Sequence, residues 1–277
     1  MTPTRPSTDD KRRAFRQLHE TGCFVIPNPW DVGSALYLQS LGFKALATTS
    51  SGFAWSQGRA DNAISRDMAL VHLQDMVAAT DLPVNADFES GFAMDAAGVG
   101  ESVRLGVETG VAGLSIEDST GNAAKPLFEL DVAVERMRAA RKAIDKSGGD
   151  TLLVGRAECF LFDRPSLDET IARLNAYANA GADCLYAPGV AVRDDIAAIV
   201  AAVAPKPFNL LVGSATKLTL NEISALGVRR VSVGGALARS AWGGFMRAAR
   251  SIAEHGTFDE FASAASGREL NALFRQT

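Results

Sequence analysis

The sequence has few of the residues that build disulfide scaffolds or zinc sites. Its 277 residues include three cysteines, Cys23, Cys159 and Cys184, with no C-x-x-C spacing among them. An odd count without that spacing favours reduced thiols and a cytoplasmic location. The three histidines all lie in helical sequence patterns, so a zinc site at the strand ends is not expected.

The chain also lacks a long apolar run and an excess of basic charge. The run AAIVAAVA is far shorter than a membrane span, and the basic residues near the start are followed by no apolar stretch. We therefore expect no membrane span and no secretory signal. The net charge of −4 argues against a general nucleic-acid binder. With 47% hydrophobic and 22% charged residues, the chain has the composition of a globular enzyme.

A repeated unit is visible in four segments. SLGFKALATTS, ETGVAGLSIED, NAGADCLYAPG and ALGVRRVSVGG each read as a helix end, a glycine, two residues and a short apolar strand. The glycines fit the left-handed position after a helix, where a missing Cβ removes a steric cost. These glycines are Gly42, Gly110, Gly181 and Gly227.

The repeat predicts an α/β fold of the (βα)8 TIM-barrel type. Further strand candidates at CFVIPNP, LPVNAD, TLLVGRA and KPFNLL bring the number of strands to eight. Alternating strands and helices indicate parallel pairing, and eight such units can close into a barrel. An open doubly wound sheet is the alternative, but no G-x-G-x-x-G follows the first strand. We expect one barrel domain over residues 1–277, with extra helices over about 236–277 that pack on another subunit.

Polar residues gather at the predicted carboxyl ends of the strands, which is where such barrels place their active sites. Strand six is the exception, because Pro188 and Gly189 offer no titratable group. The other strand ends carry Asn28, Asp31, Ser50, Ser51, Gly52, Asp87, Glu89, Glu117, Asp118, Arg156, Glu158 and Asn209.

The stretch LPVNADFESGF places two carboxylates at one strand end. Side chains at i and i+2 of a strand share a face, so Asp87 and Glu89 are expected roughly 5–6 Å apart. Glu117, at the end of the neighbouring strand, adds a third acid. Converging carboxylates favour a divalent cation such as Mg²⁺, which is held by few protein ligands and several waters. The alternative is that these acids are solvated rim residues or helix caps.

Arg156 and the segment 50–52 are candidate anion-binding groups. The planar fork of Arg156 suits a substrate carboxylate, although an internal salt bridge to Glu117 or Glu158 is the alternative. The hydroxyls and backbone amides of 50–52 could also hold an anion.

The polar segment 119–128, STGNAAKPLF, directly follows the acids at the end of strand four and contains Lys125. Its position predicts a lid that closes over the site. The alternative is an ordinary variable loop.

The sequence contains four segments that occur in the order, and at about the spacing, of the signature motifs of one superfamily. These segments are SSGFAWSQGRADN, ADFESGF, GLSIED and LVGRAE. Along nearly its whole length the sequence resembles the isocitrate lyase and phosphoenolpyruvate mutase superfamily. The resemblance implies a barrel whose eighth helix swaps between subunits, in a homotetramer built as a dimer of dimers. A swapped helix would account for the surplus chain after the eighth strand.

The resemblance also implies roles for individual residues. Asp87 would bind Mg²⁺ directly, with Mn²⁺ as the alternative ion, and Asp61, Glu89 and Glu117 would hold its waters. Ser51, Gly52 and Arg156 would hold the carboxylate of a small-molecule substrate. We therefore predict three groups of site residues. The metal-site residues are Asp87, Glu89, Asp61 and Glu117. The substrate-binding residues are Ser50, Ser51, Gly52, Arg156 and Asn209, and the catalytic residues are Lys125, Arg156 and Glu117.

The sequence departs from the superfamily in its specificity residues. Isocitrate-type lyases carry K-K-C-G-H on the loop after strand four, and its cysteine protonates the departing carbanion; this chain has neither Cys nor His there. Mutases place an Asn after the loop lysine and a His at the end of strand six, where this chain has Pro126, Leu127 and Pro188. The strand-three pair is Asp and Glu rather than Asp and Asp.

These observations predict a Mg²⁺-dependent lyase or hydrolase that cleaves a C–C bond of a small 2-oxo or 2-hydroxy dicarboxylic acid of the oxaloacetate type through an enolate. Without the loop cysteine, attack by water or loss of CO₂ is a better partner step than release of succinate. Two enzyme alternatives stay open: a (2-methyl)isocitrate-type lyase, and a phosphonopyruvate hydrolase or phosphoenolpyruvate mutase-like enzyme. An alternative of another class is a barrel that binds a 2-oxo acid without turnover.

Overall fold

Eight short parallel strands form the centre of the computed structural model, which describes residues 5–162 and 166–275. Their order in the sheet is β1-β8-β7-β6-β5-β4-β3-β2. A hydrogen bond of 3.0 Å from Ala47 N to Pro27 O links the two ends of this order, so the sheet is a nearly closed barrel. The strands are β1 (Phe24–Ile26), β2 (Leu46–Ala47), β3 (Val84–Asp87), β4 (Gly113–Glu117), β5 (Leu152–Arg156), β6 (Cys184–Tyr186), β7 (Phe208–Leu211) and β8 (Arg230–Ser232).

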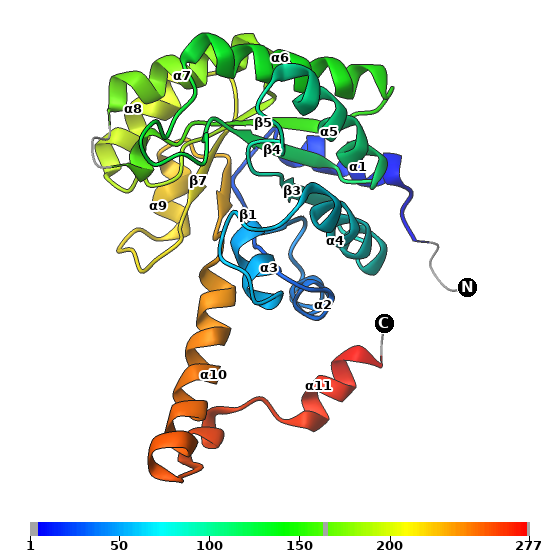
Figure 1. Ribbon diagram of the computed structural model, residues 1–277, viewed down its shortest axis with the longest axis vertical. Helices are drawn as coiled ribbons and strands as arrows, with labels where there is room; N and C mark the ends of the chain where they lie inside the picture. The colour runs from blue at the N-terminus through cyan, green and yellow to red at the C-terminus, as the bar shows by residue number, and fades with distance from the viewer. Residues whose placement is uncertain (1–4, 163–165, 276–277) are drawn as a thin grey trace.

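Helices alternate with the strands and cover the outside of the barrel (Figure 1). This arrangement confirms the predicted (βα)8 architecture. The helices of the barrel are α1 (Thr8–Leu18), α2 (Val32–Ser40), α3 (Ser50–Ser56), α4 (Arg66–Ala79), α5 (Ala96–Glu108), α6 (Leu130–Lys146), the short 3₁₀ helix η1 (Cys159–Leu161), α7 (Leu167–Asn179), α8 (Arg193–Val203) and α9 (Leu220–Ala225).

Local sequence signals set the ends of these helices. Ser7 and Asp10 form a capping box at the start of α1, where the Ser7 side chain accepts from the backbone N–H of Asp10. The four glycines of the sequence repeat all have positive φ, at 83°, 89°, 108° and 87° in chain order. Each one therefore turns the chain from a helix towards the next strand, as predicted.

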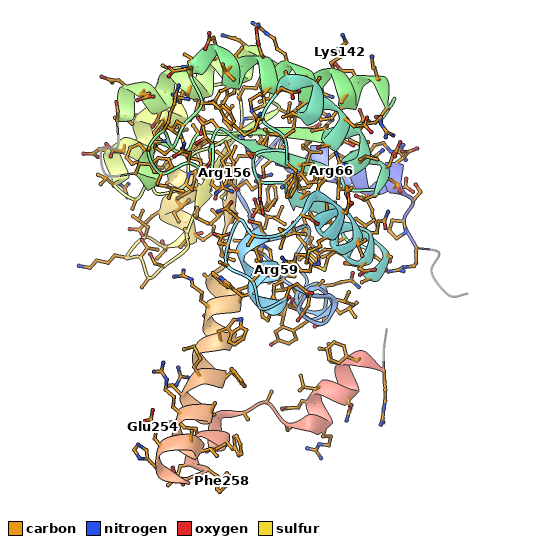
Figure 2. All side chains as sticks on the ribbon, in the orientation of Figure 1. Arg59, Arg66, Lys142, Arg156, Glu254 and Phe258 are labelled. Atoms are coloured by element: carbon orange, nitrogen blue, oxygen red, sulfur yellow. The ribbon has the colours of Figure 1, made fainter. Side chains whose placement is uncertain are left out.

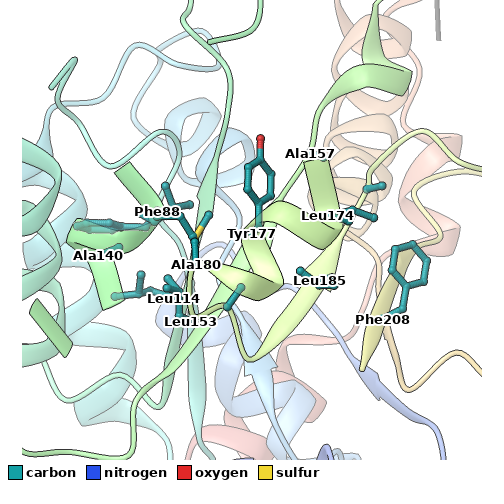
Figure 3. Close-up of a cluster of buried hydrophobic side chains, with 14 of the residues drawn as sticks. Phe88, Leu114, Ala140, Leu153, Ala157, Leu174, Tyr177, Ala180, Leu185 and Phe208 are labelled. Atoms are coloured by element: carbon teal, nitrogen blue, oxygen red, sulfur yellow. The ribbon is translucent and has the colours of Figure 1, made fainter. Parts of the chain in front are cut away.

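The main hydrophobic core lies between the strands and the surrounding helices (Figure 3). Phe88, Leu114 and Leu153 come from the strands and their ends, and Ala140 and Tyr177 come from α6 and α7. These side chains are buried, so burial of apolar surface holds the helices against the barrel. The packing fixes the positions of the strand ends that carry the polar residues.

The chain after β8 forms an arm that extends away from the barrel (Figure 1). It consists of α10 (Ala236–His255), η2 (Asp259–Ser263) and α11 (Gly267–Phe274). In α10 only Ala238 is buried, whereas Phe245 of α10 and Phe258 after it are 63% and 61% exposed. The predicted single domain with extra helices that pack on another subunit stays a prediction, and residues 276–277 lie outside the described part. Over that described part, no helix is both long and apolar enough to cross a membrane.

Candidate active site

A cavity of about 170 Å³ opens at the carboxyl ends of the strands. It lies where the predicted barrel places its active site. Most of its lining is polar, and the predicted residues Ser50, Ser51, Asp61, Asp87, Arg156 and Asn209 line it together with Asn85, Ser115, Tyr186, Arg230 and Ser232.

Arg156, the last residue of β5, is the centre of the charged cluster at this cavity. Its Nη1 lies 3.1 Å from Asp87 Oδ1 and 3.2 Å from Glu117 Oε2, and its Nε lies 2.6 Å from Glu158 Oε1. Figure 2 shows Arg156 inside the barrel. Burial alone would lower the pKa of Arg156, but the carboxylates of Glu158 and Glu117 raise it well above its ordinary value. The internal salt bridges considered above are therefore present, and a role of Arg156 in substrate binding stays a prediction.

Asp87 is held by groups from the ends of two other strands, β2 and β5. Its Oδ2 accepts hydrogen bonds from the backbone N–H of Ser50, at 2.9 Å, and from Ser50 Oγ, at 2.8 Å. Its Oδ1 accepts from Arg156 Nη1. Ser50 is the first residue of α3, whose N-cap is Thr49, so the helix start fixes the orientation of Asp87.

Glu89 does not lie in a strand, and the prediction that it shares a strand face with Asp87 is wrong. β3 ends at Asp87, and Glu89 has φ = 47°, in the left-handed region. Its side chain is nevertheless buried, and Glu89 Oε1 has no hydrogen-bond partner. Burial, and next the charge of Asp87, raises the pKa of Glu89 to about 8. A turn in the backbone, rather than strand periodicity, brings this acid to the cluster.

Two further predicted acids belong to the same cluster. Asp61 lies on the connection between α3 and α4, and burial followed by the charge of Asp87 raises its pKa. Burial also raises the pKa of Glu117 well above its ordinary value, against the opposing effect of Arg156. Together with Asp87, Glu89 and Glu158, five carboxylates thus interact with a single guanidinium.

The surplus of acids fits a divalent cation. Five acids share one arginine, and the raised pKa values of Glu89 and Glu117 indicate that their ionised forms lack a sufficient positive partner, while Glu89 Oε1 has no hydrogen-bond partner. Within residues 5–162 and 166–275, however, no three His, Cys, Asp or Glu side chains are close enough together to ligate one ion directly. An ion here would take few direct protein ligands and several waters, which is the usual manner of Mg²⁺.

Other predicted residues are not brought to the cavity. Lys125 is exposed, and its Nζ lies 3.0 Å from Glu129 Oε1. A Cβ on Gly52 would lie 2.9 Å from Trp30 Cβ and 3.2 Å from Ala238 Cβ, so close packing accounts for this glycine. Their functional roles stay predictions.

Ser51 and Asn209 do line the cavity, but their polar atoms have protein partners. Ser51 Oγ lies 3.1 Å from Thr49 Oγ1. The Asn209 amide donates to Ser232 Oγ at 2.9 Å and accepts from Arg230 Nε at 2.7 Å. Binding of a substrate at Asn209 would therefore add to, or replace, an existing network.

Tyr186 is a cavity residue that the sequence analysis missed. It is the last residue of β6 and pairs in register with Arg156 of β5. The Arg156 guanidinium carbon lies 5.0 Å from the centroid of its ring, a cation–π contact. Pro188 and Gly189 follow the end of β6, whereas Tyr186 is its last residue. The signal for Tyr186 is its register position opposite Arg156.

A family profile described as phosphoenolpyruvate phosphomutase matches residues 15–253 of this chain. The chain belongs to the phosphoenolpyruvate mutase and isocitrate lyase superfamily. This assignment confirms the predicted superfamily. Its members are carbon–carbon lyases or mutases that generally depend on a divalent metal ion, and the prediction of an enzyme is confirmed at that level.

Several proteins are similar to this chain over much of its length. A provisionally assigned lyase/mutase from Burkholderia cenocepacia J2315 has a solved structure with a TM-score of 0.94, 49% identity and 97% coverage of both chains. An uncharacterized protein of Mycobacterium tuberculosis is 31% identical over 223 residues, which are 80% of this chain and 81% of that protein. An oxaloacetate decarboxylase of Bradyrhizobium sp. is 33% identical over 180 residues, 60% of this chain and 59% of that enzyme.

Proposed function

We propose that this superfamily member is a Mg²⁺-dependent lyase or hydrolase that cleaves a C–C bond of a small 2-oxo or 2-hydroxy dicarboxylic acid of the oxaloacetate type. The observation that carries the proposal is the cluster of five acids around Arg156, of which Glu89, Glu117 and Glu158 are buried and Glu89 Oε1 is unpartnered, beside a polar cavity of about 170 Å³. The similarity to an oxaloacetate decarboxylase supports the substrate class.

Different residues of the site would bind the cation and the substrate. Asp87 would hold the cation directly, and Asp61, Glu89 and Glu117 would hold its waters. When bound, Mg²⁺ supplies a Lewis acid that stabilises negative charge on an adjacent keto oxygen. Arg156 and Ser51 would orient the substrate carboxylate, and the small volume of the cavity would limit the substrate to a few carbon atoms beyond its carboxylates.

Tyr186 is the group we assign to proton transfer, in place of the loop cysteine that this chain lacks. It lines the cavity, and its hydroxyl makes no hydrogen bond to any other described residue. Burial raises the pKa of Tyr186 to about 12, so the hydroxyl keeps its proton at neutral pH. When a C–C bond of the substrate breaks with loss of CO₂, the electron pair stays on the 2-oxo acid as an enolate. Tyr186 Oη then gives its proton to that carbon, and water restores the proton.

A substrate screen tests the proposal. Oxaloacetate, methylisocitrate, isocitrate and phosphonopyruvate are each supplied with Mg²⁺, and release of pyruvate, glyoxylate or oxalate is measured. We expect turnover of oxaloacetate or a close analogue that EDTA abolishes and added Mg²⁺ restores. Turnover of methylisocitrate or isocitrate alone would select the (2-methyl)isocitrate lyase alternative, and turnover of phosphonopyruvate alone the hydrolase or mutase alternative.

The screen also separates an enzyme from a binding protein. If none of the acids is consumed but one binds in the presence of Mg²⁺, the chain is a 2-oxo acid binding protein and the proposed reaction is wrong.

We further infer a homotetramer and a cytoplasmic location. The exposed apolar side chains of the arm support an oligomer, because a surface of this kind is normally covered in solution. The three cysteines are unpaired thiols in the structure, which is consistent with a reducing compartment.

A further inference from the structure

Arg136 of α6 binds the turn that follows β3. Its side chain is among the largest that are fully buried, at 1% exposure. Nη1 donates to the carbonyl oxygens of Ala93, at 2.7 Å, and Met94, at 2.6 Å, and Nη2 donates to the carbonyl oxygen of Ser90. One guanidinium thus contacts three carbonyl groups within five residues of the chain.

The turn that Arg136 binds has an unfavourable backbone conformation. Glu89 and Phe92 have φ of 47° and 54°, and Gly91 between them has φ of 78°. Positive φ costs free energy for residues other than glycine, and it persists only where the surroundings enforce it. Arg136 donates hydrogen bonds to Ser90 on one side of Phe92 and to Ala93 and Met94 on the other. Its side chain therefore helps to keep the turn in the positive-φ conformation.

The charge of Arg136 has no direct acidic partner. No carboxylate of residues 5–162 and 166–275 forms an ion pair with it. Three carbonyl dipoles and the face of the Phe128 ring stabilise the guanidinium, whose planar fork can reach three acceptors at once, and Asp95 adds a charge interaction. A buried cation held in this way is costly to keep, and its hydrogen bonds all go to the backbone of the turn that carries Glu89.

Arg136 also contacts the segment 119–128. Its guanidinium carbon lies 4.0 Å from the centroid of the Phe128 ring. Phe128 ends that segment, where its backbone N–H donates to Asp118 O at 2.9 Å and its carbonyl oxygen accepts from Arg173 Nη1 at 2.9 Å. The same side chain therefore contacts both segments that flank the acid cluster.

We propose that Arg136 is a positioning residue that holds the 88–95 turn in its strained conformation, directs Glu89 into the acid cluster, and couples this turn to the segment 119–128 through Phe128. The predicted effect of Arg136 on metal binding rests on the proposed function, whereas its predicted effect on the backbone of the turn does not.

The first test measures backbone hydrogen exchange in metal-free protein carrying Arg136→Lys. A lysine keeps the charge but cannot reach three carbonyl oxygens with a planar fork. The matched control is Arg12→Lys, since Arg12 is also buried and donates to two carbonyl oxygens, of Val107 and Val111, at the opposite end of the barrel. We expect faster exchange in 88–95 and 119–128 for Arg136→Lys and not for Arg12→Lys. Exchange unchanged in both segments, or raised equally throughout the barrel, would overturn the proposal.

The second test measures Mn²⁺ affinity of the same variants by electron paramagnetic resonance of the free ion. Groups that orient metal-site residues typically change affinity 10–100-fold when replaced, so we expect about tenfold weaker binding for Arg136→Lys and wild-type binding for Arg12→Lys. Equal Mn²⁺ affinities of Arg136→Lys and wild type would show that Arg136 does not position Glu89 for metal binding. Absence of Mn²⁺ binding by the wild type would instead contradict the proposed function, and the exchange test would still decide the role of Arg136.

A third variant covers the case in which Arg136→Lys does not fold. Phe128→Leu removes the aromatic ring and keeps an apolar side chain, so the three carbonyl hydrogen bonds are retained. We expect faster exchange in 119–128 and, because the two segments are coupled, in 88–95 as well. Unchanged exchange in 88–95 would show that Arg136 does not couple the two segments through Phe128 and would overturn that part of the proposal.

Discussion

Glu117 and Asp118 are neighbours in the chain, but their carboxylates have opposite environments. Glu117 Oε2 lies 3.2 Å from Arg156 in the acid cluster. Asp118 instead accepts hydrogen bonds from Tyr177 Oη at 2.5 Å and Arg173 Nη1 at 3.1 Å, in the layer between strands and helices. Successive side chains along a strand alternate in direction, which accounts for the separation. Glu117 thus belongs to the acid cluster, whereas Asp118 holds α7 to the barrel.

The different environments predict opposite effects on stability. Asp118→Ala should lower the free energy of unfolding by about 3 kcal/mol, because it leaves the buried Tyr177 hydroxyl without its acceptor and removes the buried carboxylate that pairs with Arg173. Glu117→Gln should leave it unchanged or raise it, because burial and like charges already disfavour the ionised acid. Urea unfolding of the two variants beside wild type checks this. A larger loss for Glu117→Gln than for Asp118→Ala would contradict the assignment.

Lys125→Ala tests the predicted lid. If 119–128 closes over the site, Lys125 approaches the developing charge only in the reacting complex, and kcat should fall more than KM rises. The control is Glu129→Gln, which removes the present partner of Lys125 and should leave kcat near wild type. Hydrogen exchange in 119–128 should also slow when Mg²⁺ and oxalate are added. Wild-type kinetics of Lys125→Ala with ligand-independent exchange would remove the lid from the mechanism.

Two buried histidines predict a loss of stability in acid. Burial lowers the pKa of His19 to about 3 and that of His72 to about 4, whereas both titrate near 6.5 in the unfolded chain. Because the unfolded state then binds more protons, the stability they contribute is present above pH 6.5 and is lost as pH falls through that value. Each contributes a slope of up to about 1.4 kcal/mol per pH unit until its folded-state pKa is reached.

The acids of the cluster change the free energy of unfolding with pH in the opposite direction, because the pKa of Glu89 is raised in the folded protein. The effect of a histidine is therefore measured by comparing a histidine variant with wild type. Unfolding free energies of His72→Gln and wild type are measured at pH 7.5, 6.5 and 5.5, values chosen on both sides of about 6.5. The variant should lose less stability towards acid pH than wild type. The control is His255→Gln, because His255 is exposed. Parallel pH profiles of His72→Gln and wild type would show that His72 does not stay neutral.

The exposed apolar side chains of the arm predict that the protein is an oligomer. Figure 2 shows Phe258 at the tip of the arm, and the chain makes few buried contacts there. Sedimentation should give a species about four times the chain mass of 29.2 kDa, and Phe258→Arg should shift it towards smaller species. A monomer at micromolar concentration would contradict the homotetramer.

The sequence predicted the barrel because each helix-glycine-strand unit is a local signal. Asp87, Asp61 and Arg156 were predicted to meet because their positions in the chain matched the rim or the resemblance. Glu89 was misplaced because nothing in FESGF shows that a non-glycine residue will adopt positive φ. Arg136 was missed because its contacts are to the backbone of a distant segment, and such contacts follow only from the packing of α6.

The most direct test of the account is calorimetric titration of Mg²⁺ into wild-type protein and Asp87→Ala, with Asp67→Asn as the control because Asp67 is an exposed acid on α4. The account predicts that wild type and the control bind Mg²⁺ and that Asp87→Ala, while keeping its fold by circular dichroism, does not. Undiminished Mg²⁺ affinity in Asp87→Ala would contradict the metal site on which the proposed chemistry depends.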